Sequence, residues 1–243
     1  MQLVAINSGR PEGNTYGILN QINQILAEKD FEVNMINLRE YNIKPCIGCE
    51  NCLRKDVCHI NDDADRLMDE LKRADGIIIA SPVYMGSIHG KLKMLFDRTC
   101  RWYHRPVLIA KPVLLVSTTA GSSLKYTLDY MEKVAVDWGL YPAGRVGRKT
   151  ANLSETVTIN EIKDFINALD IDREEYNPSL KQLIAFQVQK ILADKILEID
   201  RAYWVNKGWN KSLYYYDCNI NYAKKLSAKL FHRFLDSRIK PGK

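Results

Sequence analysis

The amino-acid sequence lacks any long apolar run, and its start lacks the features of a secretion signal. Its longest hydrophobic stretches, such as VLLV at 113–116, are far shorter than the ~20 apolar residues that a membrane-spanning helix needs. The residues after Met1, QLVAINSGR, contain no basic leader, no apolar core of signal-peptide length and no cleavage site. We therefore expect a cytoplasmic protein that does not associate with membranes.

The sequence also has no internal repeat, no low-complexity tract and no nucleic-acid-binding motif. Its net charge of +6 is compatible with anionic ligands but does not require nucleic acid, so no nucleic-acid partner is expected. The chain has 243 residues, of which 46% are hydrophobic. This is enough to bury one sizeable α/β core and to leave residues for an appendage.

Cysteine is sparse, but most of it is concentrated in one short segment, CIGCENCLRKDVC. The four cysteines of this segment are Cys46, Cys49, Cys52 and Cys58. Structural zinc sites usually divide their ligands into two distant pairs, whereas this compact run is similar to the ligand spacing of [4Fe-4S] proteins. We predict a [4Fe-4S] cluster, with two alternatives: a zinc site, or a metal-free loop whose thiols are redox-active or structural. A disulfide framework is not expected in a reducing compartment, and Cys100 and Cys218 are interpreted as packing residues.

Short apolar runs alternate with amphipathic segments over the first two thirds of the chain. The expected strands cover residues 3–7, 32–38, 76–81, 111–117 and 141–146, and the expected helices cover 18–26, 62–73, 90–100, 123–138 and 159–169. Five strands alternating with five helices predict an α/β fold with a doubly wound, five-stranded parallel sheet covered on both faces. A ligand is expected at the carboxyl ends of the strands.

The first loop, SGRPEGNT at residues 8–15, joins a strand to a helix and suits a phosphate. It lacks the Gly-Lys-Ser/Thr ending of a P-loop, so a triphosphate is not expected. It also lacks the dinucleotide fingerprint, because Asn7 replaces the first glycine and no acidic residue ends the second strand. A single phosphate ester fits best, and the alternative is a helix-capping loop that binds nothing.

The loop after the third strand begins SPVYMGSIHGKLKMLFDR at Ser81. Pro82 rigidifies the turn, Tyr84 offers an aromatic face, and Gly86 allows a flat ring to approach the backbone. Together with SGRPEGNT and STTAGSS (117–123), this segment resembles the NADPH-dependent FMN reductase-like branch of the flavodoxin superfamily. With the four cysteines and the following Asp-Asp pair, the sequence is most similar to the iron–sulfur flavoprotein family over about residues 1–170.

The resemblance implies a flavodoxin-like fold that binds FMN. It assigns the phosphate to Ser8, Arg10, Asn14 and Thr15. It assigns the isoalloxazine ring to Pro82, Val83, Tyr84, Met85 and Gly86 on one side and to Thr118, Thr119, Ala120 and Gly121 on the other. Because the chemistry would reside on FMN, no catalytic side chain is expected, and His89 is interpreted as exposed or helix-capping.

A cluster passes single electrons and FMN accepts one or two, so the pair would connect electron carriers with hydride equivalents. The resemblance therefore implies a flavin oxidoreductase that takes electrons from NAD(P)H or ferredoxin and reduces a small acceptor. The alternatives are a dedicated electron carrier without its own substrate and a metal-free NAD(P)H:FMN or quinone reductase with a thiol-redox loop. The resemblance also implies a homo-oligomer, a dimer or tetramer, in which the flavin of one protomer approaches the cluster of another.

The remaining sequence predicts a division into two parts. Residues 1–172 are expected to form the flavodoxin-like FMN-binding domain, with the cysteine loop at 45–60, and residues 173–243 a helical C-terminal extension. Apolar residues recur at helical spacing over 180–199 and 221–239, which predicts a helical hairpin. The aromatic residues of WVNKGWNKSLYYYD, between these segments, are interpreted as core packing.

Overall fold

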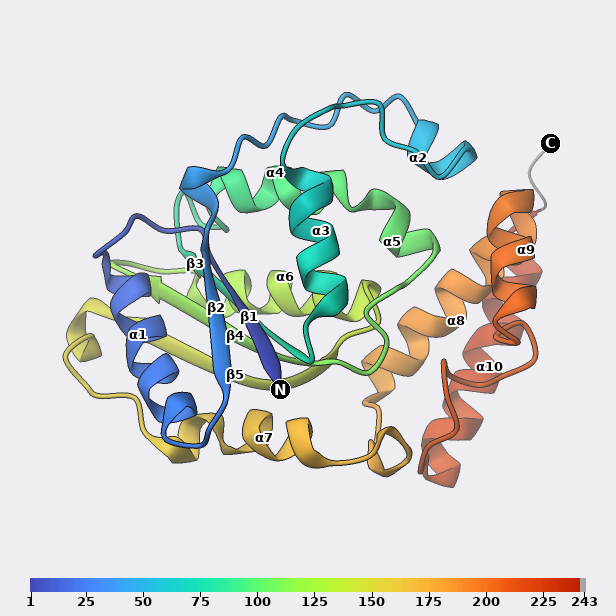
Figure 1. Cartoon of the computed structure of the whole chain (residues 1–243). Helices are drawn as coiled ribbons and strands as arrows, with labels where there is room; N and C mark the ends of the chain where they lie inside the picture. Colours follow the sequence, from blue (N-terminus) through green and yellow to red (C-terminus); the bar gives the residue numbers. More distant parts are fainter. Residues whose placement is uncertain (241–243) are drawn as a thin grey trace.

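In a computed structural model, which describes residues 1–240, five parallel strands form one sheet with helices on both faces (Figure 1). The strand order is β2-β1-β3-β4-β5, which is the flavodoxin-like order. The strands are β1 (Gln2–Asn7), β2 (Glu32–Asn37), β3 (Gly76–Pro82), β4 (Pro112–Thr119) and β5 (Tyr141–Lys149). The predicted flavodoxin-like, doubly wound sheet is therefore confirmed.

The apolar runs of the sequence become the central strands. Strands β3 and β4 are buried along almost their whole length because helices cover both of their faces. The edge strand β2 alternates between exposed and partly buried positions, and only its Ile36 is buried. At the carboxyl edge the register pairs Asn7 with Ala80 and Pro82 with Thr118. The loops that follow β1, β3 and β4 therefore leave the sheet side by side.

Six helices accompany the sheet, and two core clusters divide them between its faces, with α5 contributing Trp102 to the cluster that contains α3, α4 and α6. Helices α1 and α7 pack against one face, and α3, α4 and α6 pack against the other. Their bounds are α1 (Asn14–Ala27), α3 (Ala64–Arg73), α4 (Gly90–Arg98), α5 (Cys100–His104), α6 (Leu124–Asp137) and α7 (Ile159–Asp170). The predicted helix over 90–100 is two helices, because the chain turns at Thr99, whose hydroxyl donates to Phe96 O at 2.7 Å.

The C-terminal extension contains α8 (Leu180–Lys195), α9 (Glu198–Asn206) and α10 (Tyr222–Arg238), with α10 lying along α8 (Figure 1). The pairing of α8 with α10 confirms the helical hairpin, but the expected helix over 180–199 ends at Lys195. The break is stabilised by Arg201, whose Nε donates to Asp194 O at 2.8 Å. Among residues 1–240, no helix combines the length and the apolar character that crossing a bilayer requires.

The extension has its own apolar core. Phe186 of α8 packs edge-on against the ring of Tyr215 at 4.7 Å, and Trp209 packs edge-on against Trp204 at 5.3 Å. The aromatic segment between α9 and α10 thus fills a core, as interpreted from the sequence. Aromatic pairs of this geometry add to the stability that their burial provides.

Candidate functional site

The loops after β1, β3 and β4 enclose a cavity of about 260 Å³ at the carboxyl edge of the sheet. Its walls are Gly9, Arg10, Gly13, Asn14, Thr15, Pro82, Val83, Tyr84, Thr118, Thr119 and Ala120. Nine of the thirteen residues predicted to bind FMN are therefore brought together. The four that do not line the cavity are Ser8, Met85, Gly86 and Gly121.

The first loop is shaped by two side chains at the end of β1. The backbone N–H of Gly9 donates to Asn7 Oδ1 at 3.0 Å, and Asn7 Nδ2 donates to Gly9 O at 3.3 Å. Ser8 is fully buried, and its hydroxyl donates to Ala80 O at 3.0 Å. Asn7, which departs from the dinucleotide fingerprint, thus fixes the loop backbone, and the hydrogen of Ser8 Oγ is used within the fold.

The N-terminus of α1 opens toward the same loop. Its N-cap is Gly13, and no side chain caps the first turn, so the loop does not adopt the side-chain capping that was the alternative to phosphate binding. Uncapped N–H groups at a helix N-terminus favour an anion. Arg10, an exposed cation, lines the cavity beside Gly13, and Thr15 Oγ1 lies 2.7 Å from Thr118 Oγ1, which joins the first loop to the loop after β4.

The loop after β3 makes a tight turn at the rim of the cavity. Tyr84 and Ser87 exchange backbone hydrogen bonds of 2.9 and 3.0 Å, and the two residues between them, Met85 and Gly86, both have positive φ. Met85 is fully exposed and Tyr84 half-exposed. Val83 N donates to Thr118 O at 2.8 Å, which holds this loop against the third one. A left-handed Met is uncommon, so the turn keeps a strained backbone at the cavity rim.

His89 ends this loop and begins α4. Its backbone N–H donates to Ser81 Oγ at 2.9 Å, and its Nδ1 accepts from Lys91 N at 3.1 Å. Burial lowers the pKa of His89, and the charges of Arg39 and Lys91 lower it further. The helix-capping interpretation of His89 is confirmed.

The cysteine segment lies between η1 (Leu38–Glu40) and α3 and contains one short helix, α2 (Asn51–Arg54). All four of its thiols are free; two are exposed and two are partly buried. In the part of the chain that the structure describes, no three Cys, His, Asp or Glu side chains lie close enough to hold a metal ion. The segment therefore supplies the right donors, but its sulfurs are not gathered at one point.

The two ends of this segment are held together by the Asp-Asp pair that follows it. Asn42 N donates to Asp63 Oδ2 at 2.6 Å, and Asp63 N donates back to Asn42 O at 3.0 Å. Lys44 N donates to Asp62 Oδ2 at 2.8 Å. The cysteines are thus carried on a closed loop whose ends are fixed beside α3.

The two remaining cysteines have different outcomes. Cys218 packs against the core of the extension, as predicted. The packing interpretation of Cys100 is wrong, because Cys100 is exposed at the start of α5, beside α2. Burial raises the pKa of Cys52, and the nearby thiols of Cys100, Cys58 and Cys46 raise it further. A fifth thiol, that of Cys100, therefore lies near Cys52 and Cys46, two of the four predicted ligands.

The cysteine segment is contacted by three arginines that were not predicted from the sequence. The last residue of α4 is Arg98, α5 contains Arg101, and Arg105 directly follows α5. Their side chains donate hydrogen bonds to residues between Lys44 and Asp65. The available signal was their spacing of three and four residues in RTCRWYHR, although the turn at Thr99 places them on separate elements and not on one continuous helix.

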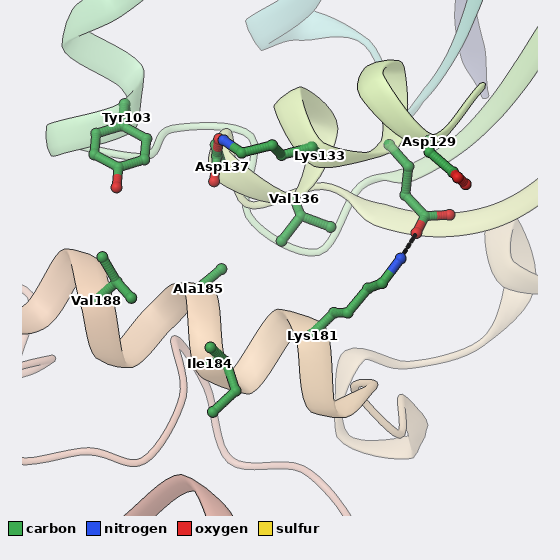
Figure 2. A pocket seen from close by; sticks show the side chains of 10 residues that line it. Tyr103, Asp129, Lys133, Val136, Asp137, Lys181, Ile184, Ala185 and Val188 are labelled. Carbon is green, nitrogen blue, oxygen red and sulfur yellow. Dashed lines mark hydrogen bonds and ion pairs between the residues drawn. The ribbon is translucent and has the colours of Figure 1, made fainter. Parts of the chain in front are cut away.

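A larger cavity of about 450 Å³ lies where α8 meets α5 and α6 (Figure 2). Val136, Ile184 and Val188 form its apolar walls, and Lys181 of α8 reaches Glu132 of α6 at 3.4 Å. None of the predicted site residues lines this cavity. It is a gap in the packing between the extension and α6.

Comparison with known proteins identifies a flavin reductase family over the part of the chain that contains the first cavity. Residues 1–146 match the family described as NADPH-dependent FMN reductase. An iron–sulfur flavoprotein of Methanocaldococcus jannaschii is 42% identical over 100 residues, which is 41% of this chain and 52% of that protein. One of Methanosarcina thermophila is 35% identical over 125 residues, which is 51% and 62% of the two chains. These matches cover less than two thirds of the relatives' own lengths.

A longer match includes the extension. An iron–sulfur flavoprotein of Clostridioides difficile is 29% identical over 228 residues, which is 86% of this chain and 99% of that protein. Among solved structures, RosB superposes with a TM-score of 0.56 at 10% identity, covering 91% of this chain and 92% of that one. The azoreductase AzrA gives a TM-score of 0.52 at 13% identity, covering 70% and 99%. At these identities the structural likenesses describe the fold alone.

Proposed function

Since the chain belongs to the NADPH-dependent FMN reductase family, an oxidoreductase family, we propose that it is an FMN-dependent oxidoreductase that exchanges electrons between FMN and a [4Fe-4S] cluster. The observation that carries the proposal is the cavity at the carboxyl ends of β1, β3 and β4, lined by residues of all three flavin motifs. A cavity at this sheet edge is where doubly wound folds bind their ligands.

The residues of the cavity, with the adjoining Met85, Gly86 and Gly121 that do not line it, fit FMN in their chemistry. The uncapped N-terminus of α1, the Arg10 guanidinium and the Asn14 and Thr15 side chains would hold the phosphate. Pro82 to Gly86 and Thr118 to Gly121 would hold the isoalloxazine ring between them, with the aromatic ring of Tyr84 at the rim. When bound, FMN supplies hydride and single-electron chemistry. The protein's part is to bind and orient it.

We propose that Cys46, Cys49, Cys52 and Cys58 ligate the cluster. Two observations support this: the four thiols are free, and similar proteins at 29–42% identity carry the name iron–sulfur flavoprotein. Because the sulfurs are not gathered in the structure, cluster binding requires the segment to close around the metal centre. The competing assignments of the same cysteines are a zinc site and a metal-free loop whose thiols are redox-active or structural.

The proposed electron donor is NAD(P)H or a ferredoxin, and the proposed acceptor is a small molecule such as a quinone, a flavin or an oxygen species. The competing function is an electron carrier with no substrate of its own. Steady NAD(P)H consumption with an added acceptor supports the enzyme. Redox exchange with protein partners alone supports the carrier.

We also propose a homo-oligomer, a dimer or tetramer. Exposed apolar side chains recur every four residues along one face of α10, at Tyr222, Leu226, Leu230 and Phe234. Such a stripe is a common feature of a helix that packs against a partner. Light scattering on the wild type and on Leu230→Glu measures this: an oligomer that the substitution dissociates supports the proposal, and a monomeric wild type contradicts it.

The deciding experiment for the function is anaerobic purification followed by analysis of flavin, iron, sulfide and zinc. We expect FMN together with about four iron and four sulfide atoms per chain, as a [4Fe-4S] cluster requires. FAD, or apo-protein that binds no flavin, contradicts the flavin proposal. Preparation with ample iron and sulfide that yields neither contradicts the cluster and leaves a flavoprotein with a structural or thiol-redox loop.

A further inference from the structure

The cysteine segment lies against a buried guanidinium. The side chain of Arg98 is 1% exposed and forms an ion pair with Asp62, whose side chain is completely buried. The same guanidinium donates to Lys44 O at 3.3 Å and to Ile60 O at 3.1 Å, on opposite sides of the cysteines. Its Nη2 also donates to Cys58 Sγ at 3.4 Å. One cation therefore joins both ends of the segment and contacts a predicted ligand.

Two further arginines hold the middle of the segment. Arg105 Nη2 donates to Cys52 O at 2.6 Å, and Nη1 donates to Leu53 O at 3.3 Å. Arg101 Nη1 donates to Asp56 O at 2.8 Å. Cys52 is the third cysteine of the segment, and Leu53 and Asp56 lie between it and the fourth, Cys58. These bonds therefore fix the backbone that carries the last two predicted ligands.

The C-terminal extension completes this arrangement through Asp200 of α9. Asp200 is completely buried; its Oδ1 pairs with Arg105, and its Oδ2 lies 2.8 Å from His104 Nδ1. Trp204, one turn later, donates from Nε1 to His104 O at 2.8 Å. Burying a carboxylate lowers the stability of the fold unless the carboxylate is paired. The contacts of Asp200 with Arg105 and His104 offset this cost and join α9 to the residues beside the cysteine segment.

The charges of Arg98 and Arg105 are paired with Asp62 and Asp200, but not every N–H donor of these arginines is used within the fold. The Nε atoms of Arg98 and Arg105 are buried and have no hydrogen-bond partner among the described residues. Unpartnered buried donors are rare, and here they belong to the two arginines that contact Cys58 and Cys52. Thiolates bring the negative charge that such a site can stabilise.

We infer that Arg98, Arg101 and Arg105, which we call the arginine row, are positioning residues for the metal centre, and that Asp200 makes the C-terminal extension part of that centre. Arg98 also acts electrostatically. Hydrogen bonds to the sulfurs and the net charge around a cluster set its reduction potential, and reduction adds one negative charge beside Arg98. This electrostatic part rests on the proposed [4Fe-4S] cluster, whereas the positioning part does not.

The electrostatic part is tested on protein reconstituted anaerobically with iron and sulfide. We expect Arg98→Gln to lower the equilibrium constant for one-electron reduction about tenfold, which is about 59 mV in the midpoint potential. Arg98→Lys, which keeps the charge, should recover most of the shift. The control is Arg54→Gln, which removes an exposed arginine of α2 that pairs with Glu50. Potentials are read by titration monitored by electron paramagnetic resonance, with the FMN potential expected to stay unchanged.

The positioning part is tested by hydrogen exchange on the metal-free protein. We expect Arg105→Gln and Asp200→Asn to increase exchange of the amides at 52–56 about tenfold, because each loses a charged hydrogen bond. His104→Gln, which removes only one contact of Asp200, should give a smaller increase. Amides of the first flavin loop and the Arg54→Gln variant should not change.

The outcomes separate the two proposals. Wild-type protein without iron or sulfide after reconstitution overturns the cluster and the electrostatic role of Arg98, while the exchange data still decide the positioning role. A cluster whose potential is the same in Arg98→Gln and Arg54→Gln overturns the electrostatic role and leaves the cluster standing. Unchanged exchange at 52–56 in both Arg105→Gln and Asp200→Asn overturns the positioning role.

Discussion

The loops after β1, β3 and β4, which we call the flavin loops because we propose that they bind FMN, are held in place differently from the cysteine segment. The flavin loops leave adjacent strands and bond directly to one another, as in Thr15 to Thr118 and Val83 to Thr118. The cysteine segment has little secondary structure and is held by side chains of other elements, chiefly Arg98 and Arg105. The flavin loops are positioned by the register of the parallel strands. The cysteine segment is positioned by charged side chains that are distant from it in sequence.

This difference has a consequence for each cofactor. A site formed by strand ends exists before the ligand binds, and the cavity between the three loops shows this. The cysteine segment is held at its ends and its middle, and Cys46 and Cys49 between these points are exposed to solvent. Positive φ at Gly48, Glu50 and Asp56 gives the segment sharp bends between its cysteines. FMN would thus meet a formed site, and iron a segment that closes around it.

The largest expected effect separates the two sites completely. Replacing any one of Cys46, Cys49, Cys52 or Cys58 by Ala should remove most of the iron and sulfide and leave the FMN content unchanged. The reason is that the cluster needs all four corners and the flavin loops lie elsewhere in the chain. Cys100→Ala is the matched control, since it removes a neighbouring exposed thiol outside the segment. Equal loss of iron in the control would mean that Cys100 is a ligand.

The second effect is on the flavin loops alone. Arg10→Ala combined with Thr15→Ala should weaken FMN binding about a hundredfold or more, since charged hydrogen bonds contribute roughly 1.5–3 kcal/mol each. Fluorescence titration of apo-protein with FMN measures the affinity. Arg73→Ala, at the exposed end of α3, is the control for the loss of one positive charge. Unchanged affinity in the double variant would contradict the assigned phosphate loop.

The third effect tests whether the extension supports the cysteine segment more than the flavin loops. Trp204→Ala should lower the free energy of unfolding by about 3–5 kcal/mol, because it empties a buried site and removes the bond to His104 O. Chemical denaturation measures the change, with Tyr126→Ala, which removes an exposed aromatic ring of α6, as the control. At low denaturant, hydrogen exchange should rise first in the cysteine segment. An equal rise in the flavin loops would remove the distinction between the two regions.

The smallest effect depends on pH and concerns the flavin loop after β3. Because the pKa of His89 is lowered, the neutral, helix-capping form is favoured in the folded protein. Its stabilisation is complete above the ordinary pKa of about 6.5 and is lost as the pH falls through the lower folded value. Removing such a cap costs about 1 kcal/mol.

FMN affinity measured from pH 7.5 to lower pH tests this prediction. We expect the wild type to lose affinity on acidification by more than His89→Asn, which keeps a capping side chain that does not titrate. The FMN phosphate itself titrates near pH 6, so the difference between the two proteins is the relevant quantity. His59→Asn, an exposed histidine of the cysteine segment, is the control. Identical pH profiles for the wild type and His89→Asn would contradict the prediction.

The sequence by itself determined the sheet and which segments carry the two candidate sites. The apolar runs at β3 and β4 allow only strands buried on two faces, and polar loops after such strands must meet at one edge of a parallel sheet. The four cysteines are neighbours in sequence, so any fold keeps them in one segment. These features are local or periodic, and the chain's own pattern is enough to show them.

Only the tertiary structure decided which side chains hold the cysteine segment in place. Arg98 reaches Cys58 across 40 residues, Arg105 reaches Cys52 across 53, and Asp200 reaches Arg105 across 95. The hydrophobic periodicity of the sequence does not predict such pairings, because a buried ion pair depends on which elements the fold brings together. The same holds for the break before α9, where Arg201 bonds to Asp194 O, and for Cys100, which the short helix α5 places beside α2.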